Sequence, residues 1–294
     1  MKSIRNPLAH AGALACLTAL VPAKCMALDV DGGDYNPLPP GSNMALLYYQ
    51  HGYSHSAYAH GNNVGGGTHL TQDIGILRMI HFMEICGFTI DPQFLLPFGH
   101  VNGKQAGSDL GTGNGVGDLI LANTIWLVNR PASGTFFGVT PMVTLPTGSY
   151  DKDDPLNIGE NRHKYTLQLG FSQRLVDKVT LDLVFDGTHF GDNDRYGSTG
   201  ATLSQRTLYQ GQTILRYNLT PSLDLRTSYS HEWGGEQFVD GLSQGRPGIN
   251  KYTIGAAYML PTKTQLIFGW GRDTSVDNGF KTQSQLNLRI AQVF

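Results

Sequence analysis

The histidines near the start of the chain are the first residues whose type and spacing could support chemistry. His51, His55, His60 and His69 lie close together in the sequence, and imidazole is a common metal ligand. On an extended strand His51 and His55 would lie about 13 Å apart, because each residue adds about 3.3 Å. The two cannot chelate one ion directly. We therefore expect polar loop and rim residues here, with no metal site and no cofactor.

Serine lies beside histidine in "SHS" (54–56) and "SYSH" (228–231), which raises the question of a hydrolase. Ser228 and Ser230 share one face of an alternating stretch, and neither is aligned with His231. Nucleophilic catalysis needs the hydroxyl and its base within hydrogen-bond reach. We expect no catalytic residues and no enzymatic activity, and a lipid hydrolase is the third of the functions considered below.

Two other patterns are typical of ligand-binding loops. The acidic stretches "DKDD" (151–154) and "DND" (192–194) offer oxygen ligands for divalent cations, but they read more simply as solvated loop tips. The stretch "GTGNGVGD" (111–118) is similar to a nucleotide loop. Such a loop follows a strand and opens a helix, whereas here a loop precedes it and a strand follows, so we expect no nucleotide site.

The elements that would position any site are strands, because apolar and polar residues alternate along most of the chain. In one example Tyr165, Leu167, Leu169 and Phe171 share a face, with Gln168 on the other. Similar stretches begin near residues 44, 70, 87, 117, 135, 179, 206, 223, 251, 264 and 282, which makes about twelve strands. The stretch 70–82 is apolar on both faces, so the alternation does not fix which residues of that strand point inward.

The connections between these strands alternate between short and long. The long ones lie near 55–68, 99–116, 147–163, 187–205, 233–250 and 272–281, and they are rich in Gly, Asp, Asn and Ser. Hairpins with one tight and one elaborated end place all tight ends on one rim. Transmembrane barrels have short periplasmic turns and longer outer loops. We therefore predict an all-β fold, a closed antiparallel transmembrane barrel over residues 42–294.

The N-terminus and the composition indicate an exported protein. Lys2 and Arg5 precede a short apolar stretch, and Ala27 is a suitable cleavage position, so residues 1–27 read as a signal peptide. Residues 28–41 would then form a periplasmic N-terminal segment. Cys86 is the one cysteine beyond residue 27, which excludes an internal disulfide in the mature chain. The net charge is −2 with no basic cluster, so no nucleic-acid partner is expected.

The barrel prediction also explains why the chain closes on an aromatic residue. Phe294 would end the last strand at the periplasmic interface, where aromatic girdles occur. A terminal aromatic after an alternating strand resembles the assembly signal of many bacterial outer-membrane barrels. The expected partners are therefore outer-membrane lipid, lipopolysaccharide, the barrel-assembly machinery through Phe294, and a small-molecule solute.

If the leucines and tyrosines face lipid, charged residues of both signs point into the lumen. Buried charges must pair or be hydrated, so we expect structural pairing for most of them. The predicted lumen-lining residues are Asp91, Asp118, Lys164, Arg174, Asp182, Asp186, Arg216, Asp224, Arg226, Glu232, Lys251 and Arg289.

Three stretches resemble one family. "LPPGSNMALLYYQH" (38–51), "GVGDLILA" (115–122) and "VTLPTGSYD" with "NIGENR" (143–162) are similar to the "MetA-pathway of phenol degradation" family of outer-membrane proteins. The resemblance runs from about residue 35 to the C-terminus and implies an outer-membrane barrel and uptake of hydrophobic or aromatic compounds. It implies no catalytic residues.

The function expected from these observations is a porin-like channel of the bacterial outer membrane for passive uptake of small, hydrophobic or aromatic compounds. The alternative is a structural or surface-interaction barrel with a closed lumen, and the third is an outer-membrane lipid hydrolase. The charges of the lumen decide between the first two, since they either line a slender path or form a plug.

Overall fold

The computed structural model describes residues 29–105 and 107–294. The expected signal peptide, residues 1–27, lies outside the described residues. Within the described part of the chain, no helix combines the length and the apolar character needed to cross a membrane.

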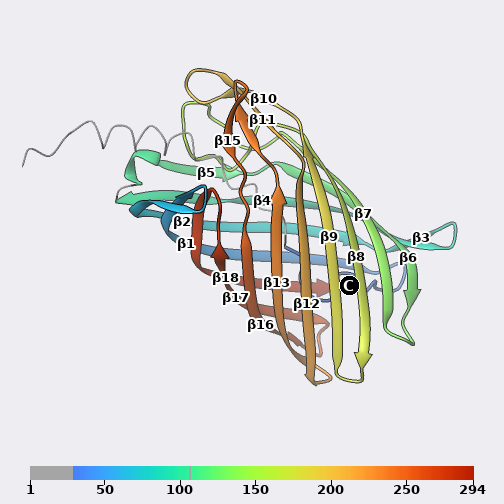
Figure 1. Ribbon diagram of the computed structural model, residues 1–294. Helices are drawn as coiled ribbons and strands as arrows, with labels where there is room; N and C mark the ends of the chain where they lie inside the picture. The colour runs from blue at the N-terminus through green and yellow to red at the C-terminus, as the bar shows by residue number, and fades with distance from the viewer. Residues whose placement is uncertain (1–28, 106) are drawn as a thin grey trace, which may run out of the picture.

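Twelve long antiparallel strands close into a barrel (Figure 1). The ring closes because β18 pairs with β1 and β2 pairs with β4. The all-β barrel predicted from the alternation is confirmed. In order around the ring, the strands are β1 (Asn43–Ala59), β2 (Asn62–His81), β4 (Phe88–Gln105), β6 (Leu119–Arg130), β7 (Thr135–Leu145), β8 (Lys164–Val176), β9 (Val179–Phe190), β12 (Leu208–Thr220), β13 (Leu223–Gly234), β16 (Asn250–Met259), β17 (Thr264–Ser275) and β18 (Gly279–Val293).

Shorter elements complete the two ends of the barrel. β3 (Met83–Ile85) follows β2 and pairs with the start of β4, and β5 (Thr112–Val116) pairs with the far part of β4. A single 3-10 turn, η1 (Ser108–Leu110), lies between β4 and β5. A separate four-stranded sheet stands at the end with the longer connections (Figure 1) and consists of β10 (Asn193–Tyr196), β11 (Ala201–Gln205), β14 (Gln237–Val239) and β15 (Leu242–Gly245).

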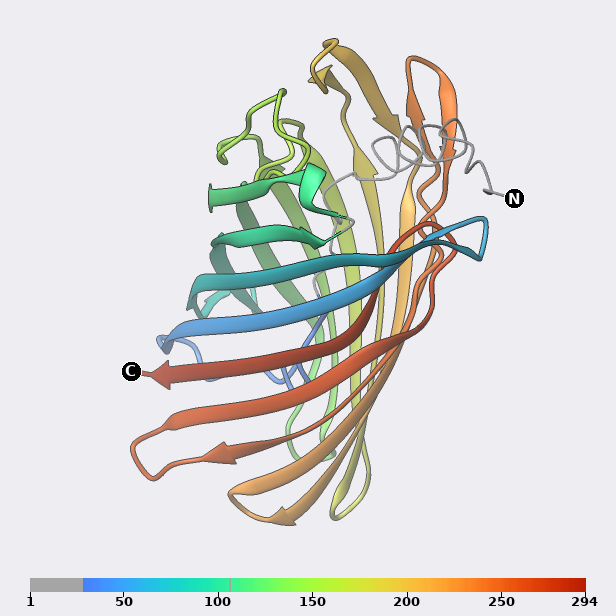
Figure 2. The ribbon, with the colours of Figure 1, turned by 90° about the vertical axis from the view of Figure 1, so that its left-hand side faces the viewer.

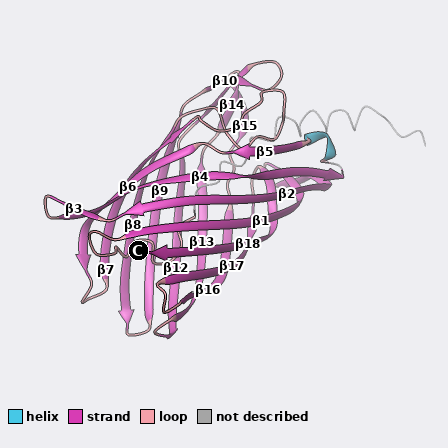
Figure 3. Ribbon diagram, turned by 180° about the vertical axis from the view of Figure 1, so that it is seen from behind, coloured by secondary structure: helices cyan, strands magenta, loops and turns pink. Residues whose placement is uncertain are grey.

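The two rims differ as the sequence predicts, with one correction (Figures 2 and 3). One rim has tight turns, such as Cys86 and Gly87, both of which have positive φ and suit a two-residue hairpin. On the other rim, the expected long loops 55–68 and 272–281 are mostly strand. β1 and β2 pair as far as Ala59 and Asn62, so that the backbone N–H and C=O groups of the two strands satisfy each other.

The outer face of the barrel is apolar, whereas the inner face is mostly polar, with one buried apolar cluster at the tight-turn end. Ile254 and Phe268 point outward and are 51% and 54% exposed. Gln168 and Ser172 on β8 point inward and are buried. The alternation does not show which residues of β2 point inward, and the structure shows that Arg78 does, because its side chain bonds Asp34 in the lumen. Such an apolar outer band is what a surrounding hydrocarbon layer requires.

A charge placed on this outer face should destabilise the barrel. Leu183 lies midway along β9 and faces outward. We expect Leu183→Arg to lower the free energy of unfolding by about 2–4 kcal/mol, because the guanidinium would sit in hydrocarbon. Urea titration of the protein in lipid vesicles measures this change. The matched control is Ser228→Arg, which places the same side chain on the lumen-facing side of β13. Equal losses for the two variants would contradict the assignment of the faces.

The chain end lies where the first barrel strand begins. The N–H of Phe294 donates to Asn43 O at 3.0 Å, and the N–H of Asn43 donates to Phe294 O at 2.9 Å. The Phe294 side chain is exposed. The last residue therefore completes the seam between β18 and β1 on the tight-turn rim and presents its ring outward.

Candidate functional site

The N-terminal stretch enters the barrel, where its aspartates meet arginines of the wall. Arg289 Nη1 on β18 lies 2.7 Å from Asp34 Oδ1 and 2.9 Å from Asp31 Oδ2. Arg78 Nη1 on β2 lies 2.9 Å from Asp34 Oδ2. The expectation of a periplasmic segment over 28–41 is therefore corrected for residues 29–35, which lie in the lumen. The reason is electrostatic, since the buried arginines require counter-ions.

The same stretch is joined to the opposite wall. Val30 N donates to Gln212 Oε1 on β12, and Gln212 Nε2 donates to Val30 O, both at 3.0 Å. Lys251 on β16 forms an ion pair with Asp29. Contacts with strands on both sides of the ring hold residues 29–35, which we call the lumen segment, across the interior of the barrel.

Tyr35 fixes the lumen segment in a niche made by two glycines. Its hydroxyl lies 3.0 Å from Thr140 Oγ1 and donates to Gln168 Oε1 at 3.0 Å. Its ring covers Gly138 and Gly170, which pair with each other on β7 and β8. A Cβ at Gly170 would come within 2.1 Å of a carbon of this ring. Only glycine leaves room for the ring at that position.

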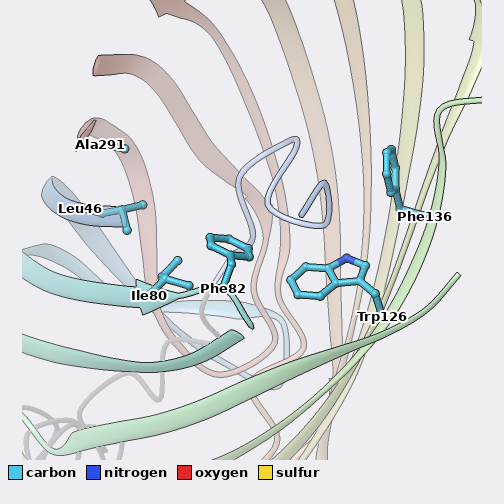
Figure 4. Packing of buried hydrophobic residues seen from close by; sticks show 6 residues of the cluster. All are labelled: Leu46, Ile80, Phe82, Trp126, Phe136 and Ala291. Atoms are coloured by element: carbon cyan, nitrogen blue, oxygen red, sulfur yellow. The ribbon is translucent and has the colours of Figure 1, made fainter. Parts of the chain in front are cut away.

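An apolar cluster packs around the chain just after the lumen segment (Figure 4). Trp126 Nε1 donates to Tyr35 O at 3.0 Å, and the rings of Trp126 and Phe82 have centroids 6.0 Å apart. Leu38 packs against the cluster, so the chain is anchored by burial as well as by ion pairs. The buried members are Leu46, Ile80, Phe82, Trp126, Phe136 and Ala291.

A small cavity remains between the lumen segment and the wall. Its volume is about 80 Å³, well below the roughly 300–1,000 Å³ of ligand pockets. Its lining combines charged side chains of the lumen segment and the wall with Tyr48, Ile76, Leu95, Ala122 and Met142. A solute larger than a few waters can therefore enter this cavity only if the lumen segment moves.

Most of the charged residues predicted to line the lumen point inward and are paired. Arg216 Nε lies 2.7 Å from Asp182 Oδ2, and Arg226 pairs with Asp224 at 2.7 Å on the same strand. Carboxylates without a basic partner accept hydrogen bonds, as Asp91 does from Thr124 N at 2.7 Å. The inward-pointing set comprises Asp91, Asp182, Asp186, Arg216, Asp224, Arg226, Glu232, Lys251 and Arg289.

Three of the predicted lumen residues lie at the rims instead. Arg174 is exposed near the end of β8 and donates to Ala132 O in the neighbouring turn. Lys164 is the first residue of β8 and pairs with Glu160 in the preceding loop. Asp118 precedes β6 and holds two outer loops together. Alternation gives the direction of a side chain along a strand, but it does not show where the strand leaves the membrane.

Asp118 joins two of the stretches that carry the family resemblance. Its Oδ1 accepts from Gly148 N at 2.9 Å, and its Oδ2 accepts from Glu160 N at 2.8 Å. Glu160 in turn forms ion pairs with Arg162 at 2.8 Å and with Lys164 at 2.7 Å. These bonds fold the β7–β8 loop, residues 146–163, over the outer end of β5 and β6.

The β7–β8 loop should stay closed far into the acidic range. Burial alone would raise the pKa of Glu160. The positive charges and hydrogen bonds of Lys164 and Arg162 outweigh the effect of burial and hold this pKa at about 2. A lowered pKa stabilises the folded loop above about pH 4.5, and the contribution disappears as the pH falls towards 2. We expect pepsin to leave the loop intact at pH 4 and to cut it near pH 2. Glu160→Gln should be cut at both pH values, and resistance of this variant at pH 4 would contradict the role of the ion pairs.

Sequence reasoning missed Arg78 and the lumen segment. The signal that could have found the segment is the acidic run "DVDGGDY" (29–35), directly after the expected cleavage point. Three carboxylates next to a barrel wall that carries inward-pointing Arg and Lys side chains are natural counter-ions. Arg78 was hidden because its strand is apolar on both faces, with Leu77 exposed outside and Ile76 and Ile80 buried inside.

The other chemistry considered from the sequence finds little support in the geometry. Ser230 is buried on the inner face of β13, whereas His231 is exposed on the outer face. His51 bonds Asp73 at 2.7 Å on the outer face of β1 and β2. Among residues 29–105 and 107–294, no group of three or more His, Cys, Asp or Glu side chains is arranged to hold a metal ion.

Solved structures similar to this chain are outer-membrane barrels. An outer membrane channel from Pseudomonas putida F1 is 40% identical with a TM-score of 0.87, covering 90% of this chain and 100% of that chain. Two others show the fold alone. The beta domain of the Bordetella autotransporter BrkA is 11% identical with a TM-score of 0.51, covering 87% of this chain and 100% of its own. The translocator domain of autotransporter NalP from Neisseria meningitidis is 12% identical with a TM-score of 0.50, covering 97% of each chain.

The closed barrel, its apolar outer face and the 40% identical relative define the protein as a channel of the bacterial outer membrane. The family model "MetA-pathway of phenol degradation" matches residues 55–290, and the chain belongs to this family. The family resemblance predicted from the sequence is confirmed. No match is found among curated proteins.

Proposed function

We propose that the barrel admits small hydrophobic or aromatic compounds passively, and that they pass between the lumen segment and the wall. The observation that carries this proposal is the cavity beside the segment, whose wall includes Tyr48, Ile76, Leu95 and Met142. Apolar side chains facing the interior of a barrel favour apolar solutes over ions. The family's link to phenol degradation supports an aromatic solute.

The second candidate is a barrel with a permanently closed lumen. Its support is the double ion pair of Asp34 with Arg78 and Arg289, together with the tyrosine niche over Gly170. Buried ion pairs of this kind hold one arrangement strongly, because separating them leaves uncompensated charges. The two candidates differ in one observable property, which is whether solute crosses the barrel.

Neighbouring positions on β6 allow a matched test. Ala122 borders the cavity, whereas Leu121 faces outward and is exposed. Proteoliposomes containing the native barrel should accumulate toluene or p-cresol faster than empty liposomes do. We expect Ala122→Trp to abolish most of this gain and Leu121→Trp to leave it unchanged.

The outcomes separate the candidates. Uptake no faster than in empty liposomes would favour the closed barrel. Equal uptake by the native barrel and Ala122→Trp would show that solute avoids this cavity. Both variants must run on gels as heat-modifiable barrels, so that a folding defect is not mistaken for a block.

We further infer how the barrel meets its membrane partners. Phe294 presents its ring on the tight-turn rim beside Asn43, which supports recognition of the chain end by the assembly machinery. Tyr53 and His69 face outward on the half of β1 and β2 nearer the longer connections, which supports contact with lipopolysaccharide. Deleting Phe294 should slow assembly in cells, and normal assembly would contradict this inference.

A further inference from the structure

A second cavity lies at the outer end of the molecule and shares no lining residue with the cavity in the lumen. Its volume is about 390 Å³, within the roughly 300–1,000 Å³ of small-molecule sites. The β7–β8 loop forms one side, β10 and β11 form the other, and Val239 of β14 contributes to the wall. This outer cavity is large enough for a molecule of one or two rings.

Hydrogen bonds between the two sides hold the outer cavity open. Tyr150 donates to Arg195 O at 2.9 Å, and Asn161 Nδ2 donates to Asn193 Oδ1 at 2.8 Å. Arg195 Nη2 donates back to Asn161 Oδ1 at 3.1 Å. Because the loop and the hairpin are joined in this way, a ligand would find the site already formed and would not have to order it.

Arg162 is a buried side chain in the lining of this cavity that can donate a hydrogen bond. Its side chain is 1% exposed, and its Cζ lies over the ring of Phe190, 4.6 Å from the ring centroid. Nε and Nη2 donate to Glu160 Oε2 at 3.0 and 2.8 Å, and Nη2 also donates to Gln205 at 2.8 Å. Within the described residues, Nη1 is buried and has no hydrogen-bond partner. A buried donor without an acceptor is costly, so an oxygen atom of a ligand would be favoured there.

The rest of the lining defines what such a ligand must be. Tyr150, Ala201, Leu203 and Val239 supply aromatic and apolar surface, which suits a ring. The charged lining residues are Lys152, Asp153, Asp154, Glu160 and Arg162, three carboxylates against two basic groups. This excess of negative charge disfavours a carboxylate ligand, and the free N–H disfavours a cation.

We propose that the outer cavity is a capture site for neutral aromatic molecules that carry one oxygen acceptor, such as phenols or aromatic ketones, with Arg162 as the donor. The proposal deepens the proposed uptake function and rests on it for its biological purpose, but binding at this site does not depend on the lumen. Captured solute would be concentrated at the outer rim of the barrel.

Calorimetric titration of the full mature protein in detergent tests the proposal. The probes are p-cresol, toluene and p-toluate, which share one ring and differ in the oxygen group. We expect p-cresol to bind at one saturable site, with toluene about tenfold weaker, since one hydrogen bond to a charged donor is lost. We expect p-toluate to be weaker than p-cresol as well. Equal affinity for p-cresol and toluene would overturn the proposal.

Three variants locate the binding. Thr199 lies in the exposed β10–β11 turn and lines the cavity, so Thr199→Trp should abolish p-cresol binding. Leu242→Trp is the matched control, because Leu242 is 71% exposed and lies outside the cavity. Arg162→Met should bind p-cresol and toluene equally. Unchanged binding by Thr199→Trp would refute the site, and this variant keeps the test valid even if Arg162→Met fails to fold.

One further variant separates this proposal from the uptake function. Ala122→Trp fills the lumen cavity and leaves the outer cavity untouched. It should bind p-cresol as the native protein does, even though its uptake is blocked. Loss of p-cresol binding in a folded Ala122→Trp barrel would place the site in the lumen and would overturn the proposal.

Discussion

Removing residues 29–36 should raise the single-channel conductance in planar bilayers by roughly threefold or more, since a barrel of this size encloses a path once its filling is removed. The deletion takes away Asp31 and Asp34, which neutralise Arg78 and Arg289. Water would replace the segment and hydrate the arginines. Their unpaired positive charge should also shift the ion selectivity towards anions.

Point variants show whether the ion pairs hold the segment. Asp34→Asn keeps the shape of the side chain and removes the charge that meets both arginines, so its conductance should lie between those of the native and truncated proteins. Asp153→Asn is the control, because Asp153 is an exposed acid in the β7–β8 loop, outside the lumen. An unchanged conductance in a folded truncated barrel would mean that other parts of the molecule close the lumen.

The fold could be predicted from the sequence because its main signal is local. Alternation with a period of two places Leu167 outside and Gln168 inside without reference to any distant residue. The outer ends of the strands could not be predicted in the same way. The Gly-rich stretch 55–68 has a loop-like composition, but it pairs as an extended hairpin because each strand supplies hydrogen-bond partners for the other.

Of the ion pairs in the lumen, only the partners on the barrel wall could be predicted from the sequence. The alternation places Arg289 and Lys251 in the lumen, but their partners Asp34 and Asp29 lie more than 200 positions earlier in the chain. No spacing rule connects residues at that separation, because the barrel must close before they meet. The niche for Tyr35 could not be predicted either, because Gly138 and Gly170 lie far from Tyr35 in the sequence.

Gly170→Ala should have the second large effect, because it removes the space that Tyr35 occupies. The new methyl group would lie about 2 Å from three carbons of the Tyr35 ring, so the ring must leave the niche and lose its bonds to Thr140 and Gln168. Overpacking of this kind costs about 1–3 kcal/mol. Displacement of the ring also loosens the lumen segment, so the conductance should rise together with the loss of stability.

A double-mutant cycle distinguishes this steric effect from a general defect of β8. In a Tyr35→Ala background the ring is absent, and Gly170→Ala should then cost almost nothing in the free energy of unfolding. The coupling energy between the two positions should be about 1–3 kcal/mol. Gly187→Ala on β9 is the control, because its nearest neighbour atom lies 3.3 Å from the new Cβ. If Gly170→Ala costs the same with and without the tyrosine ring, the niche does not anchor the segment, and closure must depend on the ion pairs alone.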